Sequence, residues 1–415
     1  MRGAIWLVLL FAAATVAALT LGDNKALVSF FYGGWRVDLS LNLFLIGAVV
    51  ATVALMLVIQ GVDSLITLPT RAKAWRALKR ERAAQAALRE AMVEHFAGRF
   101  NRAHKAAQRA LAIQASTDEL AGDRELRVLA HLLAARSLHR VQDRTRRDQL
   151  LRQALKAVRR AAPQAAVDES ARLLGAEWAL DDGDAPRARS LLAELAPGVA
   201  RRTQALRLKL RAARLSRHHT EALTTARLLA KHQAFSSEAA QGLLRSLALQ
   251  LLDAAHDGDQ LRRAWSSLDE ADRRDAFVVA RAARRAAGFG IAADGRLWLR
   301  PLWNALAELT AEQRAQVALA LATACEGVGI DWLQNTEAAQ QAYAHEAAVQ
   351  AAVGAVFAAR GLWGKAQRPL ETAAEDEGLE PAARRRAWRT LARLAREDGD
   401  EARALRCEQA AAAID

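Results

Sequence analysis

The chain has 415 residues, of which 52% are hydrophobic but only 5% aromatic, and it contains seven prolines. Much of the hydrophobic content is alanine and leucine, which are strong helix formers, so the composition predicts an almost entirely α-helical protein. It excludes a doubly wound sheet, a β-sandwich and a disulfide-stapled scaffold, and the two cysteines, Cys325 and Cys407, lack the spacing of metal ligands. The formal charge of +13 favours an anionic partner such as a membrane surface, a nucleic acid or an acidic ligand.

Two apolar segments near the N-terminus predict membrane-spanning helices. Gly3–Leu21 and Leu39–Gly61 contain no charged residue, and nineteen helical residues reach about 28 Å, enough to cross the hydrocarbon core. A cleaved signal peptide is the alternative for the first segment, because Ala17 and Ala18 are small and Arg2 precedes the segment. The segment is longer than a typical signal-peptide core and a second one follows directly, so we favour a two-span transmembrane hairpin in residues 1–70.

Charge is distributed unevenly around the second apolar segment. The loop before it carries no net charge, whereas Arg71 to Ile113 contains eleven Lys and Arg against three acids. The positive-inside rule therefore places both termini in the cytoplasm. We expect the basic block to contact anionic lipid headgroups rather than nucleic acid, because it begins at the membrane exit. Its membrane-proximal members are Arg71, Lys73, Arg76, Lys79, Arg80 and Arg82.

The short loop between the two apolar segments predicts a β-hairpin. Leu27–Tyr32 and Trp35–Leu41 are rich in aromatic residues and flank Gly33-Gly34, which is typical of a two-residue turn. We expect the aromatic side chains to form a belt at the outer membrane interface without binding a ligand. These are Phe30, Phe31, Tyr32 and Trp35.

A repeated pattern of amphipathic helices follows Pro69. A turn glycine with an alanine five residues later recurs four times, and Ala188 and Ala222 lie one tetratricopeptide (TPR) period apart. The pattern predicts a TPR-like α-solenoid of about eight units. We divide it into a basic exit helix with N-terminal repeats (71–235), degenerate helical repeats (236–336) and C-terminal repeats (337–415). The glycine–alanine pairs are Gly98/Ala103, Gly183/Ala188, Gly361/Ala366 and Gly399/Ala404.

Three stretches carry a resemblance to a known family. They are Glu94–Ala103, the alanine-rich Leu129–Arg136, and Leu362-Trp-Gly-Lys-Ala366, which is the most specific. Together with the two apolar segments and the basic block they resemble the HemY-type family, TPR proteins of the bacterial inner membrane associated with haem (protohaem IX) biosynthesis. The resemblance implies an accessory or scaffold role beside late tetrapyrrole enzymes, and it implies no known reaction.

Catalytic and cofactor motifs are absent from the sequence. It contains no H-E-x-x-H, P-loop, G-x-S-x-G or C-x-x-C-H motif, and no glycine-rich dinucleotide fingerprint. His218-His219 is the only adjacent histidine pair, and we expect a solvated turn there rather than axial haem ligands. Trp298 and Trp303 flank Pro301 and are expected to pack in a core or an interface. We therefore expect no enzyme, no metal and no cofactor, with haem or porphyrin docking left open.

One arrangement of charged residues suggests a binding site. Two predicted first helices of repeats each carry arginines on a single stripe, at the same offsets from the start of the unit. Such stripes line the groove of a TPR solenoid, and guanidinium groups bind carboxylates bidentately, so we expect tetrapyrrole propionates or an acidic partner segment to dock there. A solvated face of an arginine-rich chain is the alternative. The residues are Arg207, Arg211 and Arg214 in the first stripe, and Arg386, Arg389, Arg393 and Arg396 in the second.

These observations together predict a membrane-anchored TPR scaffold or accessory protein that supports late haem (porphyrin) biosynthesis through protein–protein interaction. Its expected partners are late haem-biosynthesis enzymes or other proteins bound in the solenoid groove, together with membrane lipids. The alternative is a TPR scaffold for an unrelated inner-membrane or envelope-assembly process.

Overall fold

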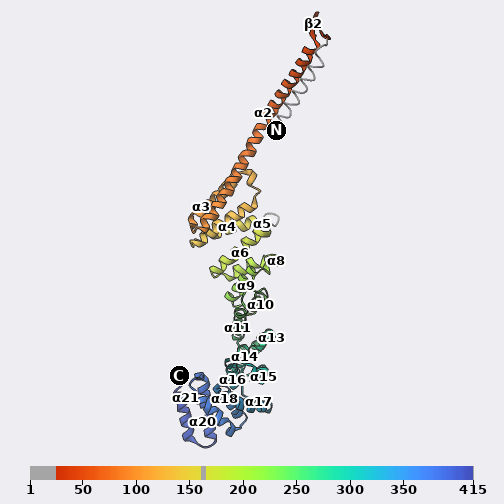
Figure 1. Ribbon diagram of the computed structural model, residues 1–415. Coiled ribbons are helices and arrows are strands. Elements are labelled where there is room, and N and C mark those ends of the chain that lie inside the picture. The colour runs from red at the N-terminus through yellow and green to blue at the C-terminus, as the bar shows by residue number, and fades with distance from the viewer. Residues whose placement is uncertain (1–24, 160–164, 415) are drawn as a thin grey trace. The chain divides into compact units, whose positions relative to one another are not determined.

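The computed structural model describes residues 25–159 and 165–414, which are helical apart from one β-hairpin (Figure 1). The first apolar segment, Gly3–Leu21, lies outside the described residues, so the predicted first span and its signal-peptide alternative both stay predictions. The chain divides into two compact units, Met1–Ala157 and Val158–Asp415. Each unit is described by itself.

The first described element is the predicted hairpin. Strands β1 (Leu27–Tyr32) and β2 (Trp35–Ser40) are antiparallel, and Tyr32 pairs with Trp35 across the turn. Gly33 and Gly34 have φ values of +59° and +91°. A two-residue turn with positive φ at both positions matches the twist of the strands and favours glycine, so the hairpin prediction is confirmed.

A single long helix, α2 (Leu41–Phe96), follows the hairpin. The side chain of Ser40 caps its N-terminus by accepting a hydrogen bond from the Leu43 N–H at 3.3 Å. Residues Leu41–Val62 have a mean hydropathy of 2.6 and none is buried, and α2 is the one helix in the described part of the chain that is long and apolar enough to cross a membrane. The helix continues past Pro69 without ending. The apolar segment and the first helix of the soluble part therefore form one continuous helix.

The rest of the N-terminal unit packs on the second half of α2. It comprises α3 (Phe100–Ala115), the 3₁₀ turn η1 (Asp118–Leu120), α4 (Arg124–Arg140) and α5 (Arg144–Arg159). Ala87 of α2, Ala110 of α3 and Ala130 of α4 form one buried cluster. Small side chains at these points allow the three helices to approach closely.

The C-terminal unit is a succession of helices, each packed on the next one or two along the chain. The first eight are α6 (Ala165–Asp181), α7 (Ala185–Ala193), α8 (Pro197–Ala200), α9 (Thr203–Leu215), α10 (His219–Lys231), α11 (Ser237–Asp253), α12 (Gly258–Ser266) and α13 (Glu270–Arg274). The others are α14 (Ala276–Gly288), α15 (Ala292–Asn304), η2 (Leu306–Glu308), α16 (Ala311–Thr323), η3 (Ile330–Trp332), α17 (Leu333–Ala342), α18 (Ala347–Ala359), α19 (Trp363–Glu375), α20 (Pro381–Glu397) and α21 (Glu401–Ala412). Packing of this kind is that of a helical solenoid.

The turn pattern read from the sequence corresponds to real helix–helix turns. All four turn glycines have φ between +72° and +80°, in the left-handed region, and all four alanines that follow them are buried. Region 236–336 also contains helix pairs, with left-handed turns at Gly290 and Gly327. The pattern of glycine and alanine missed one of these turns because the residue five positions after Gly290 is Gly295 and not alanine. Glycine is needed there, since a Cβ at Gly295 would lie 3.0 Å from the carbonyl oxygen of Ala283.

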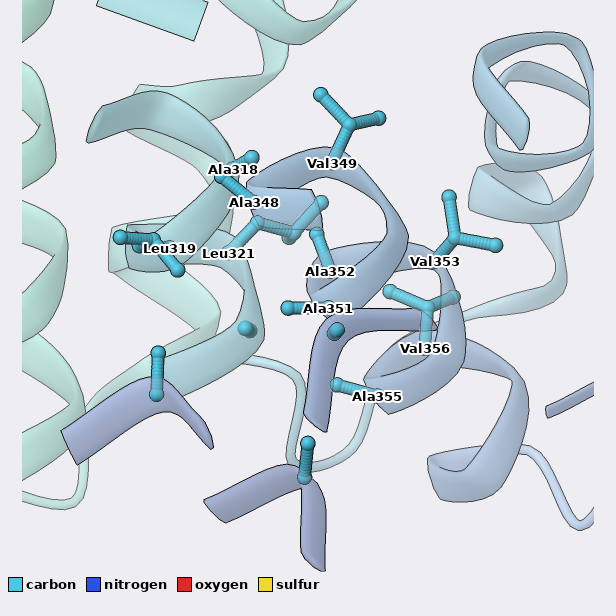
Figure 2. Close-up of a cluster of buried hydrophobic side chains, with 14 of the residues drawn as sticks. Ala318, Leu319, Leu321, Ala348, Val349, Ala351, Ala352, Val353, Ala355 and Val356 are labelled. Atoms are coloured by element: carbon cyan, nitrogen blue, oxygen red, sulfur yellow. The ribbon is translucent and has the colours of Figure 1, made fainter. Parts of the chain in front are cut away.

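The largest core lies around α18. This helix is buried along almost its whole length by α16, α17, α19 and α20. Figure 2 shows its alanines and valines beside Ala318 and Leu321 of α16. With thirteen residues, α18 is too short to span a bilayer, so its apolar character reflects burial in protein.

Candidate functional site: an arginine groove on α9

The first predicted stripe lines a groove between two helices. Arg207, Arg211 and Arg214 of α9 border a hollow of about 440 Å³, together with two leucines of the same helix and one glutamine of α11. We call this hollow the arginine groove. Its full lining is Arg207, Leu210, Arg211, Arg214, Leu215 and Gln250. The groove therefore combines guanidinium groups with an apolar wall.

The helical period explains why these arginines share one side of α9. Leu206, Leu210 and Ala213 are buried in the core with α10 and α11. Arg207 and Arg214 lie next to Leu210 on the adjoining side of the helix and are exposed.

The three arginines differ in their contacts. Arg211 pairs with Asp181 at 2.7 Å and donates to the carbonyl oxygen of Leu180 at 3.3 Å, so it links α9 to the end of α6. Arg207 donates to the carbonyl oxygen of Ala234 at 3.2 Å. Arg214 has no hydrogen-bond or ion-pair partner among the described residues. The groove thus holds one arginine committed to a carboxylate and two with free donor capacity.

The second predicted stripe, on α20, has a different environment. Arg386 donates to the Thr323 hydroxyl at 3.0 Å and borders a cavity of about 10 Å³, which has room for no more than one water molecule. Arg393 lies over the ring of Trp363, at 6.0 Å from its centroid. Arg396 is ion-paired with Glu408, while Arg389 is exposed.

The members of the basic block on α2 are all exposed, and they are spread over an arc of about 200° around the helix. Arg71 lies about 14 Å beyond Val62 along the helix and Arg82 about 30 Å beyond it, at 1.5 Å per residue. Headgroups extend only about 5–8 Å past the hydrocarbon core. Arg80, moreover, donates to the carbonyl oxygen of Ser116 at 3.1 Å. On an upright helix even the backbone of Arg71 therefore lies beyond the headgroups, and lipid contact by the block would need long side chains that extend back towards the membrane.

Histidines provide no metal site in the described residues, where no group of three or more His, Cys, Asp and Glu lies close enough to hold an ion. His218 occupies the N-cap position of α10 at the predicted turn, and its side chain contacts Arg189, with 2.6 Å between Nδ1 and Nη1. In the N-terminal unit, burial lowers the pKa of His95 and of His104, and it lowers that of His131 to about 4. These three imidazoles are neutral at pH 7.

The tryptophans and cysteines have structural environments. Trp303 is buried, and Trp298 stacks on Trp265 with 4.6 Å between ring centroids, as expected of packed residues. Burial raises the pKa of both Cys325 and Cys407, so neither is a thiolate at neutral pH.

Sequence reasoning missed two kinds of residue. Gln250 completes the arginine groove from α11, and no local pattern marks it. Arg147 occupies the position where other units have the small residue after the turn, yet it is fully buried, with Nη1 3.1 Å from His139 Nδ1 and Nη2 2.7 Å from Asp148 Oδ1. A pattern based on alanine could not find it.

Fold and site define a class of protein: a helical solenoid with an arginine-lined groove, whose first helix is continuous with a segment able to cross a membrane. A family model described as the HemY protein N-terminus matches residues 27–142. Residues 27–142 are therefore similar to the HemY N-terminus, which agrees with the resemblance found in the sequence. The matched residues comprise the hairpin and α2 to α4, and they exclude the arginine groove.

Other comparisons add little. No curated protein matches the chain. Among solved structures, a chain of the "Structure of Naa15/Naa10 bound to HypK-THB" is similar at 14% identity, with 84% of this chain and 62% of that chain covered and a TM-score of 0.26. This chain thus spans less than two thirds of that chain's length, and a likeness at this TM-score supports no statement about function.

Proposed function

We propose that this protein is an inner-membrane scaffold of the TPR type that supports late haem (porphyrin) biosynthesis by binding partner proteins, without catalysis of its own. It has two spans and both termini in the cytoplasm. One observation carries the proposal: the apolar segment Leu41–Val62 and the first solenoid helix are a single helix, α2, within the region that matches the HemY N-terminus. Anything bound to the first helices of the solenoid is thereby held at the membrane surface.

The spacing of turns supports a TPR-type array. The turns at Gly183 and Arg217 both have positive φ and lie 34 residues apart, and the alanines five residues after them, Ala188 and Ala222, are buried. A period of 34 residues with a small buried residue on each second helix is that of TPR units.

The arginine groove supports recognition of carboxylates. Arg207 and Arg214 have donor capacity that the described residues leave unused, and Leu210 and Leu215 form an apolar wall beside them. A ligand with carboxylates on an apolar body fits this chemistry, whether the propionates of a tetrapyrrole or an acidic segment of a partner enzyme.

The test replaces Arg207 and Arg214 by Glu and leaves the Arg211–Asp181 pair intact. Full-length protein is purified from native membranes in mild detergent, and co-purifying late haem-biosynthesis enzymes are quantified. Because several charge-assisted bonds of about 1.5–3 kcal/mol each are lost, we expect capture to fall more than tenfold and porphyrin to accumulate in cells.

The matched control is Arg201→Glu with Lys231→Glu. Both residues are exposed and outside the groove lining, and the charge change is equal. Equal capture by the two double variants would show that the groove is a solvated face. Capture of envelope-assembly proteins in place of haem enzymes would favour the unrelated scaffold.

A further inference from the structure

An exposed apolar stripe runs along the second half of α2. Trp75, Val93 and Phe96 are 62%, 62% and 87% exposed, and Leu78 and Met92 are also exposed. Trp75 and Leu78 lie at one end of the stripe and Met92, Val93 and Phe96 at the other, and the helical period places all five on one side of the helix. The outer stripe of α2 comprises Trp75, Leu78, Arg82, Gln85, Arg89, Met92, Val93 and Phe96.

The opposite side of the same helix is buried. Ala84, Ala87 and Ala91 pack against α3, α4 and the turn between them. An interior solenoid helix such as α18 is covered on both sides by neighbouring units. Terminal units of a solenoid require a polar outer face for solubility, and α2 instead has aromatic and aliphatic side chains there. Such a face is typical of an interaction site.

The middle of the stripe carries two arginines, Arg82 and Arg89, that have no ion-pair partner among the described residues. Arg82 and Arg89 are exposed, and Arg89 donates to the Gln85 side chain at 3.4 Å. The carboxylates beside the stripe are already engaged, Glu90 with Arg109 at 2.9 Å and Glu94 with Arg99. The remaining one, Glu81, accepts a hydrogen bond from Gln85 at 3.2 Å. An occupant that supplies carboxylates between two apolar ends would complement this face.

Two other occupants fit poorly. A second copy, paired in parallel or antiparallel, would place Arg82 and Arg89 against arginines of the other copy, which is unfavourable. Lipid is also a poor fit, because Phe96 lies about 51 Å beyond Val62 along the helix.

We propose that the outer stripe of α2 binds an amphipathic helix of a partner protein, with apolar residues at both ends and Asp or Glu in the middle. Trp75 to Phe96 is about 32 Å, so the partner helix has about 21 residues. This site is separate from the arginine groove and does not depend on the proposed function.

The test uses the full chain in lipid nanodiscs and a synthetic, fluorescently labelled 21-residue helical peptide with Leu and Phe at both ends and Glu in the middle. Binding is measured by anisotropy. We expect the Val93→Asp/Phe96→Asp variant, and a peptide in which Lys replaces Glu, each to weaken binding at least tenfold. The control Leu297→Asp/Ile330→Asp alters similarly exposed residues elsewhere and should stay within twofold.

Three outcomes would overturn the proposal. They are no binding of the Glu peptide up to about 1 mM, equal binding of the Glu and Lys peptides, and a dimer in sedimentation that Val93→Asp/Phe96→Asp dissociates. Arg207→Glu/Arg214→Glu should leave peptide binding unchanged, which separates this site from the arginine groove. Circular dichroism of each variant should match that of the parent, because the altered side chains are exposed.

Discussion

Arg211 of α9 and Asp181 at the end of α6 form an ion pair 2.7 Å long across two successive helix pairs. One of the three arginines in the groove is thus a link between units. The other two, Arg207 and Arg214, are available to a ligand. The three arginines of the groove are therefore not equivalent.

Arg211→Ala should destabilise the C-terminal unit more than Arg214→Ala does. A partly exposed ion pair contributes about 0.2–1 kcal/mol, and Arg211 also donates to the Leu180 carbonyl oxygen. We expect a loss of about 0.5–1 kcal/mol in the free energy of unfolding, measured in urea, and a smaller change for Arg214→Ala. A double-mutant cycle with Asp181→Ala should show coupling, and additive losses would contradict a link between units.

The topology of α2 is testable with reporters. A reporter fused after Asp415 should lie in the cytoplasm, and a reporter inserted at Gly33-Gly34 should lie outside the inner membrane. The reason is that positive charge follows the apolar segment Leu39–Gly61 and does not precede it. Alkaline phosphatase is active only outside the inner membrane, and a green fluorescent protein fluoresces only in the cytoplasm, so the two reporters distinguish the sides. Phosphatase activity at the C-terminus would reverse the orientation.

A truncated protein that starts at Ala74 should fold as a helical array. It keeps the part of α2 that packs on α3 and α4, and its remaining helices bury their faces against one another. Far-ultraviolet circular dichroism should show a helical spectrum, and the helical signal should disappear cooperatively on heating. A sheet-type spectrum would rule out the solenoid for the isolated fragment.

Gly354→Ala should destabilise the core around α18. A Cβ at this position would lie 2.5 Å from Cγ of Leu370 and 3.1 Å from its backbone N, so the helices must move apart. We expect a loss of about 1–3 kcal/mol, seen as a lower melting temperature. Gly242→Ala, at an exposed position of α11, has open space around the new methyl group and should be neutral or stabilising.

The N-terminal unit should lose stability in mild acid. His131 has a folded pKa of about 4, below its usual 6.5, because burial disfavours the charged ring, and the pKa values of His95 and His104 are lowered in the same direction. The unfolded chain therefore binds more protons between these values, and stability falls as the pH drops from about 6.5 towards 4.

For His131 the loss should be on the order of 3 kcal/mol at pH 4. His131→Leu should flatten this part of the profile, measured by urea unfolding of the fragment that starts at Ala74. An unchanged dependence of the unfolding free energy on pH in this variant would show that the pKa of His131 does not differ between the folded and unfolded states.

Local chemistry was enough to predict much of the architecture. Gly33-Gly34 specifies its turn because both positions need positive φ. The apolar segment Leu39–Gly61 overlaps Leu41–Val62 of α2, which is long enough to cross a bilayer. The turn glycines and the buried alanines five residues later likewise follow from backbone geometry and helix approach, and they predict helix pairs wherever both residues are present. Gly295 and Arg147 stand where the other units have the buried alanine after the turn, so the pattern of glycine and alanine could not reveal those two helix pairs.

The tertiary structure decided what the exposed side chains do. The sequence places Arg207, Arg211 and Arg214 on one stripe, but only the packing of α9 on α6 and α11 pairs Arg211 with Asp181 and adds Gln250 to the groove. The second stripe has the same spacing, yet the fold sets Arg386 against Thr323 and Arg393 over Trp363. Helical periodicity determines which side of a helix a residue occupies, whereas its partners come from segments some thirty or more residues away, which no local pattern encodes.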